Sequence, residues 1–515
     1  MTRRLVVAAT LAVVTAFTAL HARPTTVAQT TSAGSAQAQR ATAPSTPATE
    51  GPPQTLDADL DAIFADPVLA RALMAVRVDS LRTGRTLYQR NNERLIVPAS
   101  NMKLVTAAVA ATRLGWDFRY ETRLEAFGPV ANGVLRGDLI VIGDGDPSIG
   151  SHDAGAAGLF LEWAAALHAA GIHRVEGHLI GDDNAFVDEP LGAGWAWDYL
   201  ADGYAAPSGA LSYNENVAVV RLTPGATVGA PVGLALQPPG HELVAINRMT
   251  TGVPESAASV GFARLPRDAR VTISGSVPAG RPVVTRTTSV DNPTRFFVEG
   301  LRLALLERGI VVTGGAADVD DVVLPEPRQG EVRQVIARHR SEPLATLVAS
   351  FLKDSQNFYG EMLLKTVGRT SDRPGSTERG RQAAREAMAA WGQPADALVM
   401  YDGSGLSRYN YVTADGIVAI LTRVWNDEKL RGPFVAALPV GGRDGTLDLR
   451  MRSTLLDRNV RAKTGSIANV RALSGYAQTS AGDTLVFSMI ANHFTAPSAR
   501  IDAVVERALL RLVGG

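Results

Sequence analysis

Apolar residues recur along the chain at two spacings that predict different secondary structures. From Asn101 to Leu114 the chain is rich in Ala, Val and Leu and lacks Gly and Pro, which predicts a buried helix. From Ile501 to Leu512 the apolar residues fall on one helical face, which predicts a helix packed against a core. Alternating or continuous apolar runs instead predict antiparallel strands, at 75–91 (a hairpin), 459–466, 471–478 and 485–491.

The central part of the chain has a different pattern. Between residues 118 and 321, short alternating runs are separated by Gly and Pro, which predicts a mostly β segment. Helical spacing precedes this segment near Leu56 and returns at 343–367 and 376–391. We therefore expect an α+β multidomain protein in which the β segment is inserted into a helix-containing domain.

The first residues have the features of an export signal. A positive start is followed by an uncharged apolar run, Leu5 to Leu20, which is too short for a comfortable membrane span. We expect a signal peptide at 1–22, with a cleavage site as late as residue 38, and an uncleaved anchor is the alternative. Residues 23–54 are small and polar, so we expect a disordered tether there. The mature protein is expected in the periplasm or cell envelope, without a stable membrane span.

Composition excludes several classes of protein. Acidic and basic residues balance at 51 each, so no net field attracts nucleic acid, and we expect no nucleic-acid partner. The chain has no cysteine, which excludes thiol chemistry and cysteine metal sites, and its eight histidines form no HExxH motif. The absence of a G-x-S-x-G motif argues against an α/β-hydrolase. We expect neither a metal nor an organic cofactor.

Lysine is rare, and its positions suggest catalysis. Only five of the 51 basic residues are lysines, and two of them lie in Ser100-Asn101-Met102-Lys103 and Lys463-Thr464-Gly465. A desolvated ammonium group can lose its proton, whereas a guanidinium cannot. Ser100 and Lys103 are three residues apart on the predicted helix, so the amine can reach the hydroxyl. We interpret Ser100 as a nucleophile and Lys103 as its base, whose pKa is lowered by burial and by the charge of Lys463.

The order of three motifs points to a known family. Ser-x-x-Lys also fits Ser350–Lys353, and Ser-x-Asn occurs both at Ser212–Asn214, which we assign to a strand of the insert, and at Ser355–Asn357. Ser-x-x-Lys, Ser-x-Asn and Lys-Thr-Gly, in this order, resemble the signature of the penicillin-recognising serine enzymes. The long gap from Ser100 to Ser355 and the segment Asp402–Arg408 resemble one family of these enzymes. This is the class C low-molecular-mass penicillin-binding proteins of peptidase family S13, D-alanyl-D-alanine carboxypeptidases and endopeptidases.

The resemblance implies both a fold and an activity. It implies a penicillin-binding or β-lactamase-like catalytic domain, an antiparallel sheet flanked by helices, that two mostly β domains interrupt. It also implies a serine DD-peptidase that cleaves peptidoglycan stem peptides through an acyl-enzyme on Ser100, the serine that β-lactams acylate. The alternatives are a serine β-lactamase on the same scaffold and a non-catalytic cell-wall binding protein. The expected boundaries are 55–120 and 326–515 for the catalytic domain, 121–149 and 209–325 for one insert, and 150–208 for the other.

The remaining motif residues are assigned from their chemistry and from the resemblance. Ser355, on a loop between two helical segments, is expected to pass a proton between Lys103 and the leaving amine. Asn357 is expected to anchor this loop and the lysine. By resemblance, Lys463 and Thr464 hold the carboxylate of the substrate.

Backbone groups and specificity residues complete the predicted site. Gly465 allows a substrate backbone to approach closely. By resemblance, the backbone amides of Ser100 and Ser466 form the oxyanion hole. In related enzymes a carboxylate of the smaller insert and an arginine after Gly-Ser-Gly-Leu-Ser recognise a diaminopimelate side chain. Asp198 and Arg408 occupy the matching positions here.

Overall fold

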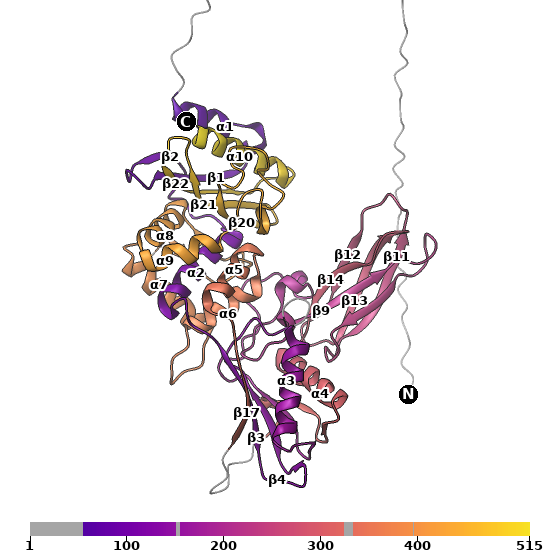
Figure 1. Ribbon diagram of the computed structural model, residues 1–515. Helices are drawn as coiled ribbons and strands as arrows, with labels where there is room; N and C mark the ends of the chain where they lie inside the picture. Colours follow the sequence, from indigo (N-terminus) through magenta and orange to yellow (C-terminus); the bar gives the residue numbers. More distant parts are fainter. Residues whose placement is uncertain (1–54, 151–154, 324–332, 395, 515) are drawn as a thin grey trace, which may run out of the picture. The chain divides into compact units, whose positions relative to one another are not determined.

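The computed structural model describes residues 55–150, 155–323, 333–394 and 396–514, which form a mixed α+β fold (Figure 1). The predicted signal peptide and tether lie outside the described residues. None of the helices within the described ranges is long and apolar enough to cross a membrane.

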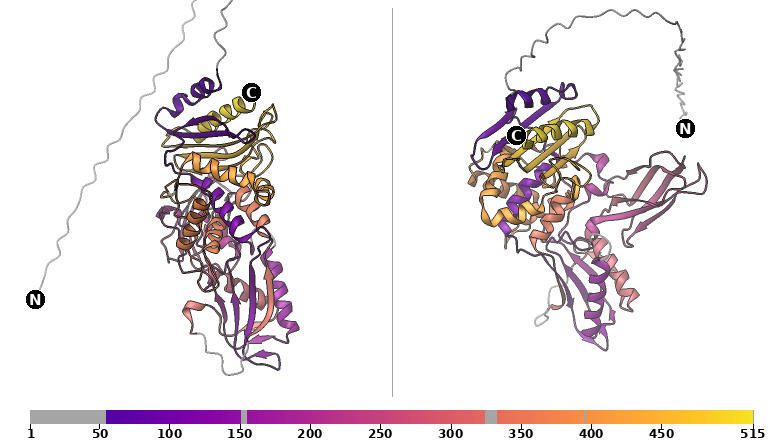
Figure 2. Two further views of the ribbon diagram at one scale, coloured as in Figure 1. Left: turned by 90° about the vertical axis from the view of Figure 1, so that its left-hand side faces the viewer. Right: turned by 45° about the horizontal axis from the view of Figure 1, so that its top comes forward.

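Strands from both ends of the chain form one antiparallel five-stranded sheet, in the order β2-β1-β22-β21-β20 (Figure 1). Alternate residues of its strands enter two different cores, so both faces of the sheet are covered. Helices α1 and α10 pack together on one face and α8 covers the other, as the views in Figure 2 show. The predicted hairpin, the three C-terminal strands and the last helix are confirmed. Their bounds are β1 (Leu73–Ser80), β2 (Thr86–Arg90), β20 (Arg461–Ile467), β21 (Val470–Gln478), β22 (Thr484–Asn492), α1 (Leu56–Phe64) and α10 (Ser498–Gly514).

A group of helices surrounds α2 (Met102–Leu114) beside this sheet. Helix α2 is buried from Met102 to Ala111 and contacts each of α5 to α9. Its many small side chains let neighbouring helices approach closely, and the predicted buried helix is confirmed. The surrounding helices are α5 (Leu344–Lys353), α6 (Asn357–Val367), α7 (Thr377–Ala390), α8 (Ala414–Asn426) and α9 (Glu428–Ala437).

The chain leaves the helical part at Tyr120 and returns at Ser341, where the Ser341 amide donates to the Tyr120 carbonyl oxygen. The adjoining strands β3 (Glu121–Phe127) and β17 (Gln334–Arg340) pair antiparallel, so the two crossings lie side by side. They belong to a sheet in the order β16-β8-β6-β3-β17, on which α3 and α4 pack. A smaller sheet has the order β15-β7-β5-β4. The bounds are β4 (Val130–Ala131), β5 (Val134–Leu135), β6 (Asp138–Ile142), α3 (Gly155–Ala169), β7 (Arg174–Val175), β8 (Leu179–Asp182), α4 (Pro293–Glu307), β15 (Val311–Val312) and β16 (Ala316–Asp318).

This pairing differs from the predicted division of the insert. Strand β8 comes from the range predicted as a separate domain, 150–208, yet it pairs with β6 and β16 of the other predicted domain. Strand β17 also extends the insert to residue 340, beyond the predicted boundary at 325. The physical reason is that alternation marks a strand without indicating its partner, and these partners are far apart in the sequence.

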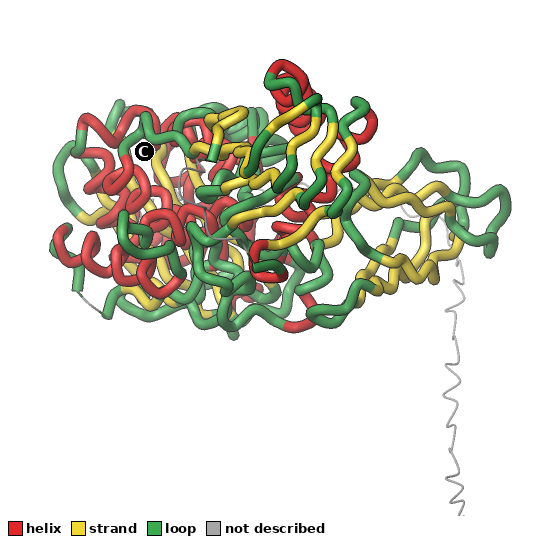
Figure 3. The backbone as a smooth tube through the Cα atoms, turned by 90° about the horizontal axis from the view of Figure 1, so that it is seen from below, coloured by secondary structure: helices red, strands yellow, loops and turns green. Residues whose placement is uncertain are grey.

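A second β unit of the insert lies between Val217 and Ser289. Two three-stranded sheets, β10-β9-β14 and β11-β13-β12, enclose a small core, and Figure 3 shows them as strands joined by loops. The Ser212–Asn214 motif precedes this unit, as predicted, but Asn214 begins a 3-10 turn (Asn214–Asn216) instead of a strand. The strands are β9 (Val217–Thr223), β10 (Gly233–Gln237), β11 (Val244–Gly252), β12 (Ser259–Ala263), β13 (Arg270–Pro278) and β14 (Val284–Ser289).

Candidate active site

Ser100 lies in a sharp turn at the N-terminal end of α2. It belongs to the 3-10 turn η2 (Ala99–Asn101), and Ala99 has a φ of 47°, which side-chain-bearing residues rarely adopt. Gly405 packs against this turn so closely that a Cβ there would lie 1.9 Å from the Ala99 carbonyl oxygen. The turn holds the Ser100 hydroxyl at the positive end of the α2 dipole.

Lys103, the second residue of α2, lies about one turn after Ser100 and is fully buried. Its Nζ is 2.9 Å from Ser100 Oγ, 2.6 Å from Asn357 Oδ1 and 2.7 Å from the carbonyl oxygen of Ser404. The two carbonyl oxygens can only accept hydrogen bonds, whereas the Ser100 hydroxyl can also donate. A neutral Lys103 amine can therefore give its two hydrogens to the carbonyls and keep its lone pair for the Ser100 hydroxyl.

The protonation of Lys103 depends on its surroundings. Burial lowers the pKa of Lys103 to about 7, against the opposing charges of Asp402 and Glu361. Burial also raises the pKa of Glu361 to about 8, with a further contribution from Asp402. The Glu361 carboxylate accepts hydrogen bonds from the Gly403 and Ser404 amides, at 3.3 and 2.9 Å. Glu361 thus holds in place the segment whose Ser404 carbonyl accepts from Lys103. Glu361 was not identified from the sequence.

Ser355 and Asn357 lie where α5 ends and α6 begins. The Asn357 Nδ2 donates to the Tyr204 carbonyl oxygen at 2.9 Å, which turns its Oδ1 toward Lys103. Ser355 has a φ of 61°, and its Oγ is 2.8 Å from Lys463 Nζ. No hydrogen bond joins Ser355 to Lys103 in the described part of the chain, so Ser355 is linked to the other lysine.

Lys463 is buried on β20. Its pKa is lowered well below the usual value, first by burial and second by the positive charge of Lys103. The predicted lowering of the Lys103 pKa by the charge of Lys463 is not found, because burial alone lowers that pKa. The charge of Lys103 instead helps to lower the pKa of Lys463. Gly465 lies directly beside the nucleophile turn, since a Cβ there would be 2.8 Å from the Pro98 carbonyl oxygen and 3.2 Å from the Ser100 nitrogen. The strand is regularly paired with β21, and Ser466 is exposed.

The second Ser-x-x-Lys motif has a separate place. Lys353 Nζ forms an ion pair with Asp444 Oδ2 at 2.6 Å and does not contact the nucleophile turn. Asp444 precedes the 3-10 turn η7 (Gly445–Leu447), whose Thr446 hydroxyl is 2.7 Å from the Thr464 hydroxyl. The ion pair thus stabilises a turn that lies against the Lys463-Thr464-Gly465 strand.

A comparison with protein families agrees with this geometry. Residues 56–509 match the model of the D-Ala-D-Ala carboxypeptidase 3 (S13) family. The chain belongs to this family. It is accordingly a hydrolase of the serine carboxypeptidase type.

The chain is similar over most of its length to curated relatives and to a solved structure. The D-alanyl-D-alanine carboxypeptidase of Actinomadura sp. (strain R39) is 34% identical over 464 residues, 87% of this chain and 83% of the relative. The carboxypeptidase DacB of Haemophilus influenzae is 28% identical over 426 residues, 82% of this chain and 85% of the relative. The crystal structure of penicillin binding protein 4 (dacB) from Haemophilus influenzae has a TM-score of 0.73 at 25% identity, and the match covers 85% of this chain and 94% of that chain. The predicted penicillin-binding α+β fold is confirmed.

Two residues that sequence reasoning missed link the motifs of this S13 carboxypeptidase. Asn101 is fully buried, and its Nδ2 donates to the Lys463 carbonyl oxygen at 2.9 Å. Its Oδ1 accepts from the Ser474 hydroxyl on β21 at 2.6 Å. Asn101 lies within the first motif and could have been suspected, whereas nothing in the sequence indicated Ser474.

The insert contributes directly to the site. Trp195 Nε1 donates to Asp402 Oδ2 at 2.9 Å, and Asp402 Oδ1 accepts from the Gly405 amide at 2.8 Å. The Tyr204 carbonyl, which accepts from Asn357, also belongs to the insert. The insert therefore contacts Asn357 directly and, through Asp402, the segment that carries the Ser404 carbonyl. These are the two groups that accept from Lys103.

The two predicted specificity residues lie at the margins of this region. Arg408 donates to the carbonyl oxygen of Ala468, just beyond β20, at 3.3 Å. Asp198 is exposed in the 3-10 turn η3 (Trp197–Tyr199). Its charge adds to burial and to Asp202 in raising the pKa of Tyr204, so Asp198 lies near the Tyr204 turn. Neither residue contacts the Ser100 and Lys103 side chains within the described ranges.

Proposed function

We propose that the protein is an exported serine DD-peptidase that cleaves D-Ala-D-Ala bonds, and D-Ala-diaminopimelate cross-links, of peptidoglycan through an acyl-enzyme on Ser100. The observation that supports this proposal best is the environment of Lys103. Two carbonyl oxygens can accept hydrogen bonds from the two hydrogens of a neutral amine. The third neighbour of the nitrogen is the Ser100 hydroxyl at 2.9 Å. This is the arrangement that a neutral amine needs to act as a general base.

Acylation begins with attack of Ser100 Oγ on the carbonyl carbon before the scissile bond. The hydroxyl proton passes to Lys103 Nζ as the new C–O bond forms. The negative oxygen of the tetrahedral intermediate is stabilised by the backbone amides of Ser100 and Ser466. The α2 dipole adds to this stabilisation because its positive end lies at Ser100.

Expulsion of the leaving amine needs a proton. Ser355 is the donor that we assign, because its hydroxyl can be replenished from Lys463 Nζ at 2.8 Å. Bond cleavage releases D-alanine, or the cross-linked partner strand, and leaves the acyl group on Ser100. Exchange with solvent then removes the proton from Lys103 and returns one to Lys463. Neutral Lys103 takes a proton from a water molecule as that water attacks the ester, and the proton passes to Ser100 Oγ as the ester bond breaks, which restores the enzyme.

Recognition of the terminal carboxylate is assigned to the strand around Thr464. The hydroxyls of Thr464 and Thr446 form a polar pair at 2.7 Å that can turn to donate to a carboxylate. The buried charge of Lys463 adds attraction for an anion. Arg408, which donates to the Ala468 carbonyl oxygen just beyond this strand, and Asp198 are proposed to contact the charged end of a diaminopimelate side chain.

Digestion of purified sacculi tests the proposal, with Ser100→Ala as the inactive control. Loss of one D-alanine from monomer muropeptides indicates carboxypeptidase action, and conversion of dimers to monomers indicates endopeptidase action. Absence of both products would refute the proposal and favour a binding protein. Hydrolysis of the penicillin adduct within seconds would instead favour a β-lactamase, because β-lactams should inhibit a DD-peptidase through a long-lived adduct.

A further inference from the structure

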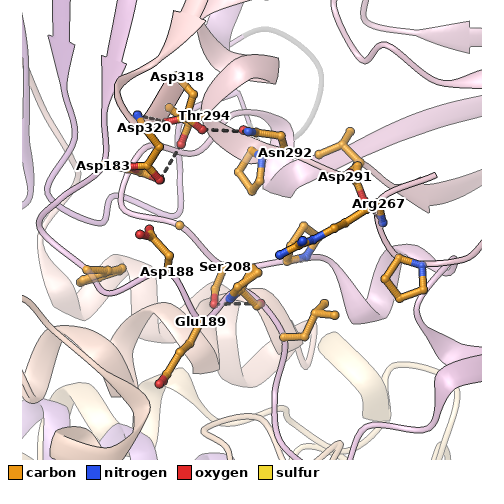
Figure 4. A pocket seen from close by; sticks show the side chains of 18 of the residues that line it. Asp183, Asp188, Glu189, Ser208, Arg267, Asp291, Asn292, Thr294, Asp318 and Asp320 are labelled. Carbon is orange, nitrogen blue, oxygen red and sulfur yellow. Dashed lines mark hydrogen bonds between the residues drawn. The ribbon is translucent and has the colours of Figure 1, made fainter. Parts of the chain in front are cut away.

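The insert contains a cavity of about 490 Å³, drawn in Figure 4. None of the residues that we assign to catalysis lines it. Its walls come from residues 183–191, residues 207–210, the loop Arg264–Arg267 after β12, the start of α4, and the turn after β16. A cavity of this size, formed where several segments meet, is large enough for a small ligand.

One end of the cavity is acidic. Asp183, Asp188, Asp318 and Asp320 lie on the same side of the cavity in Figure 4. Asp183 accepts from the Thr294 hydroxyl at 2.6 Å, and Asp318 accepts from Asn292 at 2.8 Å. No lysine or arginine of the described residues forms an ion pair with any of these four aspartates.

The carboxylates at the acidic end repel one another. Burial raises the pKa of Asp183 to about 6, and repulsion by Asp318, Asp188 and Asp320 adds to this effect. An ammonium group placed among these carboxylates would offset the repulsion. In the described part of the chain no group of three His, Cys, Asp or Glu side chains is arranged to hold a metal ion. We therefore consider an organic cation as the ligand of the acidic end.

The opposite end of the cavity is basic. The side chain of Arg267 extends into the cavity in Figure 4 and has no hydrogen-bond or ion-pair partner among the described residues. Arg264 lies beside it, paired with Asp291 at 2.9 Å, and its side chain is only 5% exposed. The Arg264 Nε is buried without a partner. Arg267 is exposed and its charge has no partner, whereas the Arg264 Nε is a buried donor without one, so this end is suited to a ligand that carries an acceptor.

Apolar residues also line the cavity. They include Leu191, Leu200, Val290 and four prolines. Proline walls are rigid, so little conformational entropy is lost when a ligand binds. The cavity therefore matches a short ligand with an ammonium at one end, a carboxylate at the other and an aliphatic part between.

We infer that this cavity binds a second, uncleaved stem peptide, with an ammonium group among the four aspartates and a carboxylate at Arg267. The inference rests on the proposed function, because that function supplies the class of ligand. Stem peptides with free amines and carboxylates are abundant in a peptidoglycan polymer. Occupancy of this site would hold the enzyme on the polymer while Ser100 acts on a neighbouring peptide.

Calorimetric titration of the penicillin-acylated protein tests the inference, because the adduct occupies the active site. The probe is the free tripeptide L-alanyl-γ-D-glutamyl-meso-diaminopimelate, which has no D-alanine to release. We expect one saturable site, with binding weakened about tenfold or more by Asp188→Asn and by Arg267→Gln, since each removes a charge-assisted contact. Asp268→Asn and Arg270→Gln remove an exposed ion pair that does not line the cavity, and they should leave binding unchanged.

Three results would overturn the inference. They are no binding to the acylated wild-type protein, equal binding by the Asp188 and Arg267 variants, and equal competition by spermidine, which has no carboxylate. Failure of the proposed function is detected separately, because mass spectrometry of the same sample would then show no penicillin adduct. An adduct without tripeptide binding therefore refutes only the second site.

Discussion

The contact between the insert and the catalytic segment allows a sharp prediction for Trp195→Phe. Phenylalanine keeps a six-membered aromatic ring but lacks the five-membered ring and the Nε1 hydrogen that is donated to Asp402 at 2.9 Å. Asp402 is fully buried, so water cannot replace the lost donor. A hydrogen bond to a buried charge contributes about 1.5–3 kcal/mol, and we expect the free energy of unfolding to fall by that amount.

The same substitution should change acylation as well as stability. Asp402 raises the pKa of Lys103, and its segment carries the Ser404 carbonyl that accepts from Lys103 at 2.7 Å. With one donor fewer, the charge of Asp402 attracts the Lys103 proton more strongly. The pH midpoint of the acylation rate should therefore move upward from about 7, the pKa to which burial lowers Lys103. We also expect the rate at neutral pH to fall about tenfold, which corresponds to about 1.4 kcal/mol in the barrier.

Trp197→Phe is the matched control, because Trp197 lies two residues away, is 74% exposed and donates no hydrogen bond to Asp402. Its effect on the free energy of unfolding should stay within about 0.5 kcal/mol. Denaturant unfolding and stopped-flow acylation by a fluorescent penicillin, from pH 5 to 9, measure both quantities. If Trp195→Phe behaves like Trp197→Phe in both assays, the insert does not support the catalytic base.

Three further predictions follow from the same geometry. Lys103→Met should slow penicillin acylation at least about a thousandfold while the variant stays folded by circular dichroism, whereas Lys353→Met should leave acylation easily measurable. In the wild-type enzyme kcat/KM should rise with pH through about 7, because only neutral Lys103 can take the Ser100 proton and burial lowers its pKa to that value; a flat profile between pH 5 and 8 would contradict this role. Gly405→Ala should abolish acylation and destabilise the fold because its Cβ would lie 1.9 Å from a carbonyl oxygen, whereas Gly392→Ala, also at positive φ but with open space, should keep full activity.

Helices and strands could be predicted where the apolar residues follow one regular spacing over the whole segment. The Ala-rich segment forms α2, and the alternating C-terminal segments form β20 to β22. Pairing in the insert could not be predicted, because β8 joins β6 and β16 through contacts between residues far apart in the chain. Short strands of similar composition can exchange partners without any change in their pattern.

The sequence motifs predicted one part of the candidate site, the residues that lie within the motifs themselves. Ser100, Lys103, Asn357 and Lys463 were named from motif order, and the structure brings their side chains together through hydrogen bonds that involve Lys103 or Ser355. The supporting groups were less visible. The effect of Glu361 on Lys103 depends on burial and on the fold of a distant segment, and a lone acid in a helix gives no sign of either.

The proposed mechanism requires that Ser100, deprotonated by Lys103, becomes acylated. Tandem mass spectrometry of proteolytic peptides from the penicillin-treated protein tests it most directly. We expect one peptide with the added mass of an intact penicillin, located on Ser100, and no adduct in Ser100→Ala. An adduct on any other residue, or undiminished labelling of Ser100→Ala, would contradict it.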